Sequence, residues 1–226
     1  MKNYFSLTGL CLAGFSLVLM NSCKKDSPSN GGNSKKEEFD QMYTITQKGW
    51  VIKENTVSTS YSTAPWTQGV GGTDKTGSTY GFVAYSYKNT PDEYAYSAIN
   101  GLDSNAAISS WLITPSLFIK NGVKISFYTR GDASGYYTDR MQVLLNHSAS
   151  TNVGDGTNTV GDFTTVLFDI NAEQKPGRYP QTWTKYEYTF TGIPEKTEMR
   201  IAFRHYVDHP LNARGIGIDL FEFWDN

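Results

Sequence analysis

Residues 124–130, KISFYTR, alternate apolar and polar side chains with the two-residue period of a β-strand. Because successive side chains on a strand point to opposite faces, Ile125 and Phe127 should face a core, and Lys124, Ser126, Tyr128 and Arg130 should face outward. The run 199–207, MRIAFRHYV, repeats the pattern with Ile201 and Phe203. These two runs predict strands that are buried on one side.

Four further runs are rich in β-branched and aromatic residues and are separated by Gly, Asn, Asp and Pro, which is typical of strands joined by turns. They are residues 140–145, 163–170, 184–190 and 216–223. No stretch of the domain carries a convincing helical period. Many short strands with long connections predict an all-β fold, a jelly-roll β-sandwich, with a closed barrel as the alternative.

The first 22 residues read as a lipoprotein signal peptide. Lys2 supplies a positive start, residues 7–20 (LTGLCLAGFSLVLM) form an apolar run, and a cleavage site ends at Cys23. The apolar run is shorter than the ~20 residues that a transmembrane helix needs. We expect lipidation of Cys23, whose acyl chains would anchor the protein to a membrane.

Residues 24–36, KKDSPSNGGNSKK, contain no large apolar residue and cannot contribute to a core. Residues 23–36 are therefore predicted to be a lipidated cysteine and flexible tether, followed by one domain over 37–226. The Cys-Lys-Lys-Asp start resembles Bacteroidetes lipoproteins, which implies an outer-membrane lipoprotein at the cell surface. A periplasm-facing orientation is the alternative.

Composition excludes several classes of protein. The formal net charge is −2 and the pI about 5.9, without a basic stripe, which argues against nucleic acid as a partner. The two cysteines are Cys11, in the signal peptide, and Cys23. The mature domain therefore has no disulfide and no cysteine-based metal site.

A set of short motifs, in order along nearly the whole domain, resembles the choice-of-anchor J family, a relative of the cleaved-adhesin domains. The resemblance implies a jelly-roll sandwich similar to carbohydrate-binding modules and to MAM-type adhesion domains, without a defined ligand. The motifs are 38–40 (EFD), 49–51 (GWV), 66–69 (WTQG), 110–115 (SWLITP), 121–122 (NG), 127–130 (FYTR), 139–143 (DRMQV), 161–164 (GDFT), 179–180 (YP) with Trp183, 202–204 (AFR) and 215–219 (GIGID).

The chain carries none of the common catalytic motifs. His205 alternates with Ile201 and Phe203, so we interpret it as a packed or strand-end histidine. A carboxylate pair for glycoside hydrolysis needs only two acids at a suitable separation. We expect the available acids to cap turns, pair with arginine or bind calcium, and we predict no enzyme; they are Asp132, Asp139, Asp169, Glu173 and Asp219.

The resemblance to calcium-bearing sandwich modules implies a structural Ca²⁺ site that joins the N-terminal segment to the last strand. Glu38, Asp40 and Asp219 are the candidate ligands, since carboxylates suit Ca²⁺. Asp219 could equally be the partner of an arginine, Arg204 or Arg130. The acid-containing loop 152–158 lacks the final bidentate Glu of a calcium loop, so we interpret it as a turn.

Three arginines, Arg130, Arg140 and Arg204, fall in three predicted strands. Planar guanidinium groups suit carboxylates and aromatic faces. The three residues therefore form either a buried network with Asp139 and Asp219 or the polar floor of a ligand groove.

Three loop aromatics are the candidate platform for a sugar. Trp66 follows Pro65 in a polar stretch, and Tyr136 and Tyr137 lie in a loop between two strands. An exposed ring can stack on the apolar face of a sugar while nearby polar groups bind its hydroxyls. The other tryptophans at motif positions, Trp50, Trp111 and Trp183, are predicted to be core.

The sequence thus predicts a non-catalytic, surface-anchored binding module for a glycan or another cell-surface polymer, which contacts the membrane only through its lipid. The alternative is an adhesion or assembly protein that binds a protein partner. A groove with exposed aromatic residues would favour a glycan, and a flat apolar patch of several hundred Å² would favour a protein.

Overall fold

The computed structural model describes residues 34–57, 65–73, 79–80, 82–85, 93–98, 107–208 and 213–225. The predicted signal peptide and Cys23 lie outside these residues. Within the described ranges, no helix is long and apolar enough to cross a membrane.

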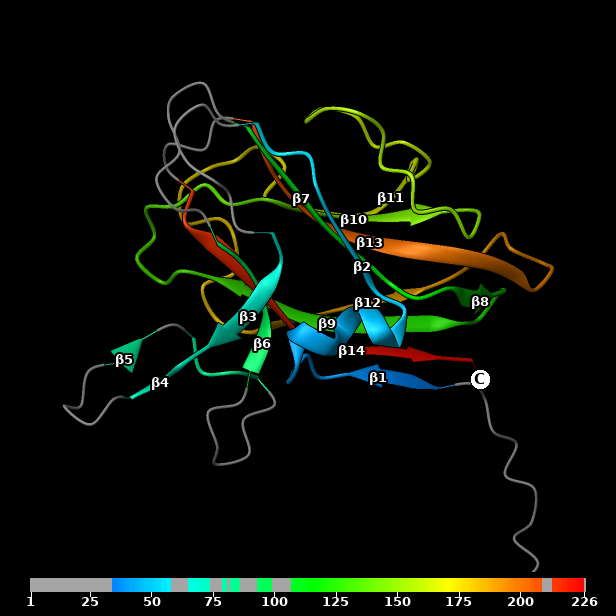
Figure 1. The fold of residues 1–226 in the computed structure, drawn as a ribbon, viewed down its shortest axis with the longest axis horizontal. Coiled ribbons are helices and arrows are strands. Elements are labelled where there is room, and N and C mark those ends of the chain that lie inside the picture. The colour runs from blue at the N-terminus through cyan, green and yellow to red at the C-terminus, as the bar shows by residue number, and fades with distance from the viewer. Residues whose placement is uncertain are drawn as a thin grey trace, which may run out of the picture. The chain divides into compact units, whose positions relative to one another are not determined.

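The strands form two six-stranded antiparallel sheets (Figure 1). Sheet A has the order β12 (Thr184–Thr189), β9 (Lys124–Gly131), β14 (Gly215–Trp224), β6 (Glu93–Ala98) and β3 (Thr67–Val70), with β1 (Lys35–Glu37) paired to β14. Sheet B has the order β11 (Thr165–Ile170), β10 (Met141–Asn146), β13 (Thr197–Val207), β7 (Ile108–Ile113) and β2 (Val51–Glu54), with β8 (Leu117–Ile119) paired to β13. A small separate hairpin pairs β4 (Gly72–Thr73) with β5 (Thr79–Tyr80). The fold is the predicted jelly-roll β-sandwich and not a closed barrel.

The main core lies between the two sheets. Ile125 and Phe127 of β9 and Ile201 and Phe203 of β13 are fully buried there, on the faces that alternation predicted. The rings of Phe127 and Phe203 meet edge to face across the sheets, with centroids 5.0 Å apart. The period of two thus placed the inward-facing side chains of β9 and β13 correctly.

All six predicted strands are present, as β9 to β14, with ends that differ by at most two residues. The strands of the first half were not predicted, because their patterns are short or mixed. In β7, for example, Ser109 and Ser110 are as deeply buried as their apolar neighbours. Hydrophobicity alone therefore did not reveal this central strand.

One short helix was also not predicted. The 3₁₀ helix η1 (Met42–Lys48) buries Met42 and Ile45, which are three residues apart and so lie on one face. It ends at Gly49, whose φ of +86° is in the left-handed region that glycine adopts without strain.

Lys35 and Lys36, assigned to the tether from sequence, form the first two residues of β1. They pair with Phe223 and Glu222 of β14. The ordered part of the domain therefore begins before Glu37, and a truncation at that residue would remove part of sheet A.

Candidate ligand-binding surface on sheet A

Residues 82–85, called the strap below, lie on the outer face of sheet A. Phe82 packs against Tyr94 and Tyr96 of β6 and against Trp183, with ring centroids 5.6, 5.7 and 6.4 Å apart. Its backbone N–H also donates to the Tyr94 hydroxyl at 3.0 Å. These side chains form a cluster separate from the main core, so part of the outer face is covered. Trp183, predicted to be core, is only half-buried on this face.

Two more hydrogen bonds fix the strap. The indole Nε1 of Trp183 donates to the carbonyl oxygen of Val83 at 2.6 Å. The backbone N–H of Tyr85 donates to Asp219 Oδ2 at 2.8 Å. The strap is thus held to the sheet by polar contacts along its length, in addition to aromatic packing.

Asp219 is positioned by a bulge in β14. The strand register shifts between Asp219 and Glu222, and Leu220 has a φ of +49°. The Leu220 N–H donates to Asp219 Oδ1 at 2.7 Å, and the carboxylate is fully buried. Each carboxylate oxygen of Asp219 therefore accepts a backbone N–H bond, one of them from the strap.

At the end of the strap, Tyr85 stacks on Tyr128 of β9. Their ring centroids are 3.5 Å apart at 16°, and their hydroxyls form a hydrogen bond of 2.8 Å. This hydrogen bond, together with partial burial, raises the pKa of Tyr128 to about 12. Tyr85 remains 42% exposed. The pair presents one aromatic ring to solvent on the outer face of sheet A.

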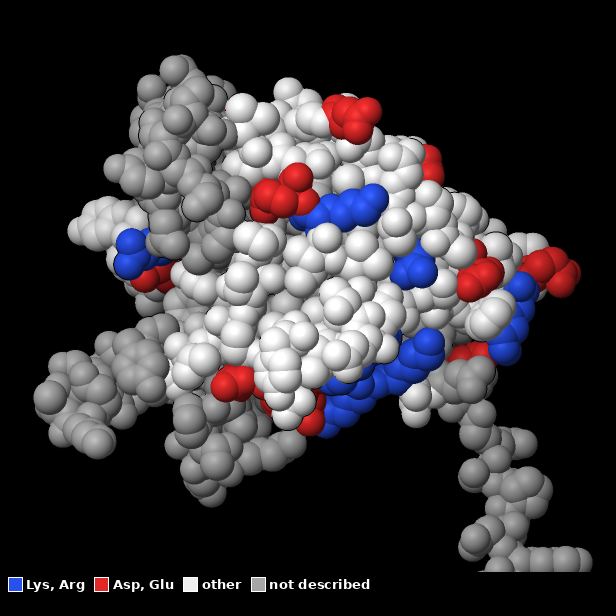
Figure 2. All heavy atoms as spheres, in the orientation of Figure 1, with Lys and Arg blue, Asp and Glu red and all other residues white. Residues whose placement is uncertain are grey.

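Lys185, which is opposite Tyr128 in the sheet, lines a hollow of 480 Å³, called the sheet-A groove below. Trp224 contributes an aromatic ring, and Glu222 and three lysines contribute charge. Figure 2 shows Lys and Arg side chains gathered near β1 with Asp and Glu among them. The residues that line the groove are Ser34, Lys35, Lys36, Lys185, Glu222, Phe223 and Trp224.

The three predicted calcium ligands, Glu38, Asp40 and Asp219, differ in their exposure and in their partners. Glu38 pairs with the Lys36 ammonium at 2.9 Å, and this hydrogen bond raises the pKa of Lys36. The negative charges of Glu222 and Asp219 raise the same pKa further. Asp40 is exposed, and Asp219 is buried. In the part of the chain that the structure describes, no three His, Cys, Asp or Glu side chains are grouped to hold a metal ion. Calcium binding stays a prediction.

Arg140 and Arg204 lie on the outer face of sheet B. Arg140 binds Asp169 with two hydrogen bonds, of 2.7 and 2.6 Å. The buried Arg204 stacks on Tyr206 and Trp111, 3.9 and 4.7 Å from the ring centroids. Burial lowers the pKa of Arg204 to about 10.

The hydrogen bonds of Arg204 go to Ser109, Gln142 and the carbonyl oxygen of Thr157, so it fixes the loop that precedes β11 to the sheet. Arg130 instead lies on sheet A, 4.4 Å from the ring centroid of Phe82. Because the three arginines are divided between opposite faces of the sandwich, they do not form one groove floor.

Trp66 is not an exposed platform, which corrects the sequence interpretation. It is 1% exposed and donates from Nε1 to the Ser110 carbonyl oxygen at 3.2 Å. The polar context suggested a loop, but Trp66 immediately precedes β3 and its ring enters the main core.

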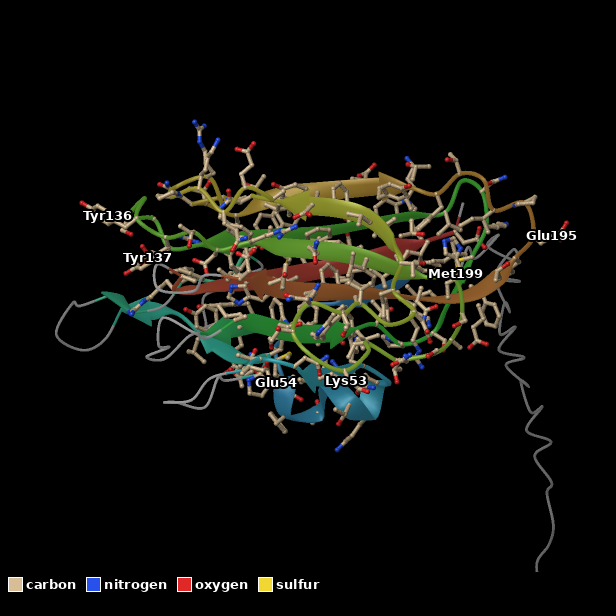
Figure 3. The ribbon with its side chains drawn as sticks, turned by 90° about the horizontal axis from the view of Figure 1, so that it is seen from above. Lys53, Glu54, Tyr136, Tyr137, Glu195 and Met199 are labelled. Atoms are coloured by element: carbon tan, nitrogen blue, oxygen red, sulfur yellow. The ribbon has the colours of Figure 1, made fainter. Side chains whose placement is uncertain are left out.

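Tyr136 and Tyr137 lie in the β9–β10 loop at one end of the sandwich (Figure 3). Tyr136 is 76% exposed and projects outward, and Tyr137 is partly buried. The structure thus leaves Tyr136 accessible, at the end opposite Glu195 and Met199.

Ser97, His205 and Asp139 form a connected row that looks like a catalytic triad. His205 Nδ1 lies 2.9 Å from Ser97 Oγ, and Nε2 lies 3.1 Å from Asp139 Oδ1. In serine proteases the ring nitrogens have the opposite roles. All three residues are at most 1% exposed, and Asp139 also accepts from the Gly215 N–H at 3.0 Å. The row therefore links the two sheets through the core, as expected of a packed histidine.

The other acids considered for hydrolysis have structural partners. Asp132 accepts from the Ser134 N–H at 2.7 Å and so caps a turn. Asp169 pairs with Arg140, and Glu173 pairs with Lys175. The loop 152–158 is a turn, as predicted, with Asn152 Oδ1 accepting from the Gly154 N–H at 3.0 Å.

Sequence reasoning did not predict that aromatic residues gather on the outer face of sheet A. Tyr128 was placed correctly on the outer face, but nothing in the pattern indicated that Tyr85 stacks on it. Trp224 follows the predicted final strand directly, but strict alternation gives it the parity of the core residues Ile216 and Ile218, and it faces outward only because of the bulge after Asp219.

The solved structures that are similar to this chain include two cleaved adhesin domains of Lys-gingipain from Porphyromonas gingivalis. They are 21% and 17% identical, with TM-scores of 0.54 and 0.52, over 86% and 85% of this chain and 99% and 98% of theirs. A family 11 carbohydrate-binding module from Clostridium thermocellum is 14% identical, with a TM-score of 0.42, over 87% of this chain and 97% of its own. No family model and no curated protein matches the chain. At these identities the likeness concerns the fold alone, which is similar to that of the cleaved adhesin domains.

Proposed function

We propose that this chain is a non-catalytic binding module whose ligand, a glycan, binds in the sheet-A groove. The observation that carries the proposal is the position of Trp224 and of the Tyr85–Tyr128 pair beside Lys36, Lys185 and Glu222. Aromatic faces stack on the apolar faces of sugar rings, and ammonium and carboxylate groups bind hydroxyls. The groove therefore combines the two kinds of contact that a sugar requires.

The exposed apolar residues support a glycan over a protein partner. A protein-binding surface would present a contiguous apolar patch of several hundred Å². The large apolar residues that are exposed among the described residues come from several segments, which include η1, β3, β8, β11 and the strap, where both Val83 and Tyr85 are exposed. A protein partner is nevertheless an outcome that the test below can detect.

We propose that Cys23 is lipidated and holds the domain at the outer membrane, with the cell surface as its location. The eleven residues 24–34 separate Cys23 from β1, and a flexible chain of that length spans about 20 Å r.m.s..

A glycan array tests the proposal with residues 24–226, which keep β1 intact. We expect the wild-type protein to retain a defined set of glycans and Trp224→Ala to lose most of that signal at an unchanged melting temperature. Tyr43→Ala, which removes a 78% exposed ring from η1, is the matched control and should bind as the wild type does. Retention of no glycan, together with capture of a cell-surface protein, would replace the proposal with the protein-binding alternative.

A further inference from the structure

We infer that the sheet-A groove takes the end of a glycan chain or a short oligosaccharide, and not the interior of a long polymer. This inference rests on the proposed function and adds the class of ligand. It follows from the position of the strap, whose end stacks on Tyr128, the residue opposite the groove-lining Lys185.

The strand register places the end of the strap next to the groove. Tyr128 is opposite Asp219 on β14 and opposite Lys185 on β12. In the following row, Ser126 is opposite Glu222, and their side chains are 3.4 Å apart. Lys185 and Glu222 line the groove. The stacked Tyr85–Tyr128 pair therefore stands at its boundary.

The strap also extends across sheet A and not only along one strand. Phe82 contacts Tyr94 and Tyr96 of β6, Arg130 of β9, and Trp183, which directly precedes β12. A long polymer that crossed the strands here would have to occupy the volume of the strap. The sheet-A groove lies on the β1 side of the sheet, where Lys35 and Lys36 line it.

The contacts of the strap indicate that it is a fixed wall. Its backbone groups bond to side chains of Tyr94, Trp183 and Asp219, and Phe82 is only 8% exposed. A ligand that displaced the strap would expose Phe82 and leave the buried Asp219 carboxylate without one of its donors. The free groove of 480 Å³ is in the lower half of the range for small-ligand pockets.

The test uses the full chain in detergent micelles and the glycan class that the array selects, prepared as a ladder from disaccharide to long polymer. Isothermal titration gives the affinity and the stoichiometry for each member. We expect the affinity to stop rising once the glycan is a few sugar units long. We also expect the amount of protein bound to be proportional to the molar concentration of glycan chain ends. Stoichiometry that follows polymer mass would overturn the inference and leave the proposed function standing. Absence of binding to every ladder would refute both.

Tyr85→Ala provides an independent test because it removes the ring at the end of the strap. The ratio of affinity for the long polymer to that for the shortest bound member should rise in Tyr85→Ala and stay unchanged in Tyr43→Ala. This ratio is informative even if the variant binds more weakly throughout. An unchanged ratio in Tyr85→Ala would show that the wall does not limit the ligand.

Discussion

Replacement of Asp219 by Asn should loosen the strap and destabilise the domain. Asp219 is fully buried, and its oxygens accept from the N–H groups of Tyr85 and Leu220 at 2.8 and 2.7 Å. An amide keeps one acceptor and replaces the other with a donor, so one N–H loses its partner and the other loses a charged acceptor. A buried group without a partner costs about 1–3 kcal/mol, and bonds to charged groups are the stronger ones. We expect a loss of about 2–4 kcal/mol and a melting temperature lower by roughly 5–12 °C.

Thermal unfolding with and without EDTA separates this role from calcium binding. If Asp219 acts by holding the strap, Asp219→Asn melts earlier and EDTA changes neither protein. If Asp219 binds Ca²⁺, EDTA lowers the melting temperature of the wild type and does not change that of the variant. The stability that the wild type loses is ~2.7 kcal/mol when the Ca²⁺ concentration before chelation is about a hundred times the dissociation constant. Asp132→Asn, an equal change in an exposed turn, should shift stability by no more than about 0.5 kcal/mol. Equal melting of Asp219→Asn and the wild type would refute the reasoning.

Three other predictions concern single groups. Burial raises the pKa of Glu54, whose Oε2 has no hydrogen-bond partner among the residues that the structure describes. Stability should therefore fall as the pH rises above the ordinary glutamate value of 4.5, so Glu54→Gln should be more stable than the wild type at pH 7 and equally stable near pH 4, measured by urea unfolding; an equal gain at both pH values would argue against it. Tyr85→Phe should lower the pKa of Tyr128 from about 12 toward 10, followed by NMR of the ring carbons, and an unchanged titration would mean that the two hydroxyls do not bond. Cys23→Ala should prevent acylation, and incorporation of labelled palmitate into that variant would contradict the proposal that Cys23 carries the lipid.

The extent to which the fold could be predicted depended on how regular each strand is. β9 and β13 have strict alternation and one buried face, so Ile125 and Phe203 were placed correctly. β7 is buried on both faces and includes Ser110, so it lacks alternation. Trp66 was misjudged because a polar neighbourhood along the chain says little about which residues surround a ring in space.

The candidate site was less predictable than the fold, because contacts distant in sequence create it. The hydrogen bond between Tyr85 and Asp219 joins residues 134 positions apart. The bulge that directs Asp219 toward the strap depends on a left-handed Leu220, a conformation that the residue type does not indicate. Sequence reasoning identified Asp219 as important but could not give its partner.

The central claim is that a glycan binds in the sheet-A groove, and hydrogen–deuterium exchange tests it most directly. Exchange is followed in the full chain with and without the glycan that the array selects. Our account predicts slower exchange in β1, in the second half of β14 around Trp224, and in β12 around Lys185. Exchange in the β9–β10 loop around Tyr136 should not change. Protection confined to that loop, with none in β1, β12 or β14, would contradict the account.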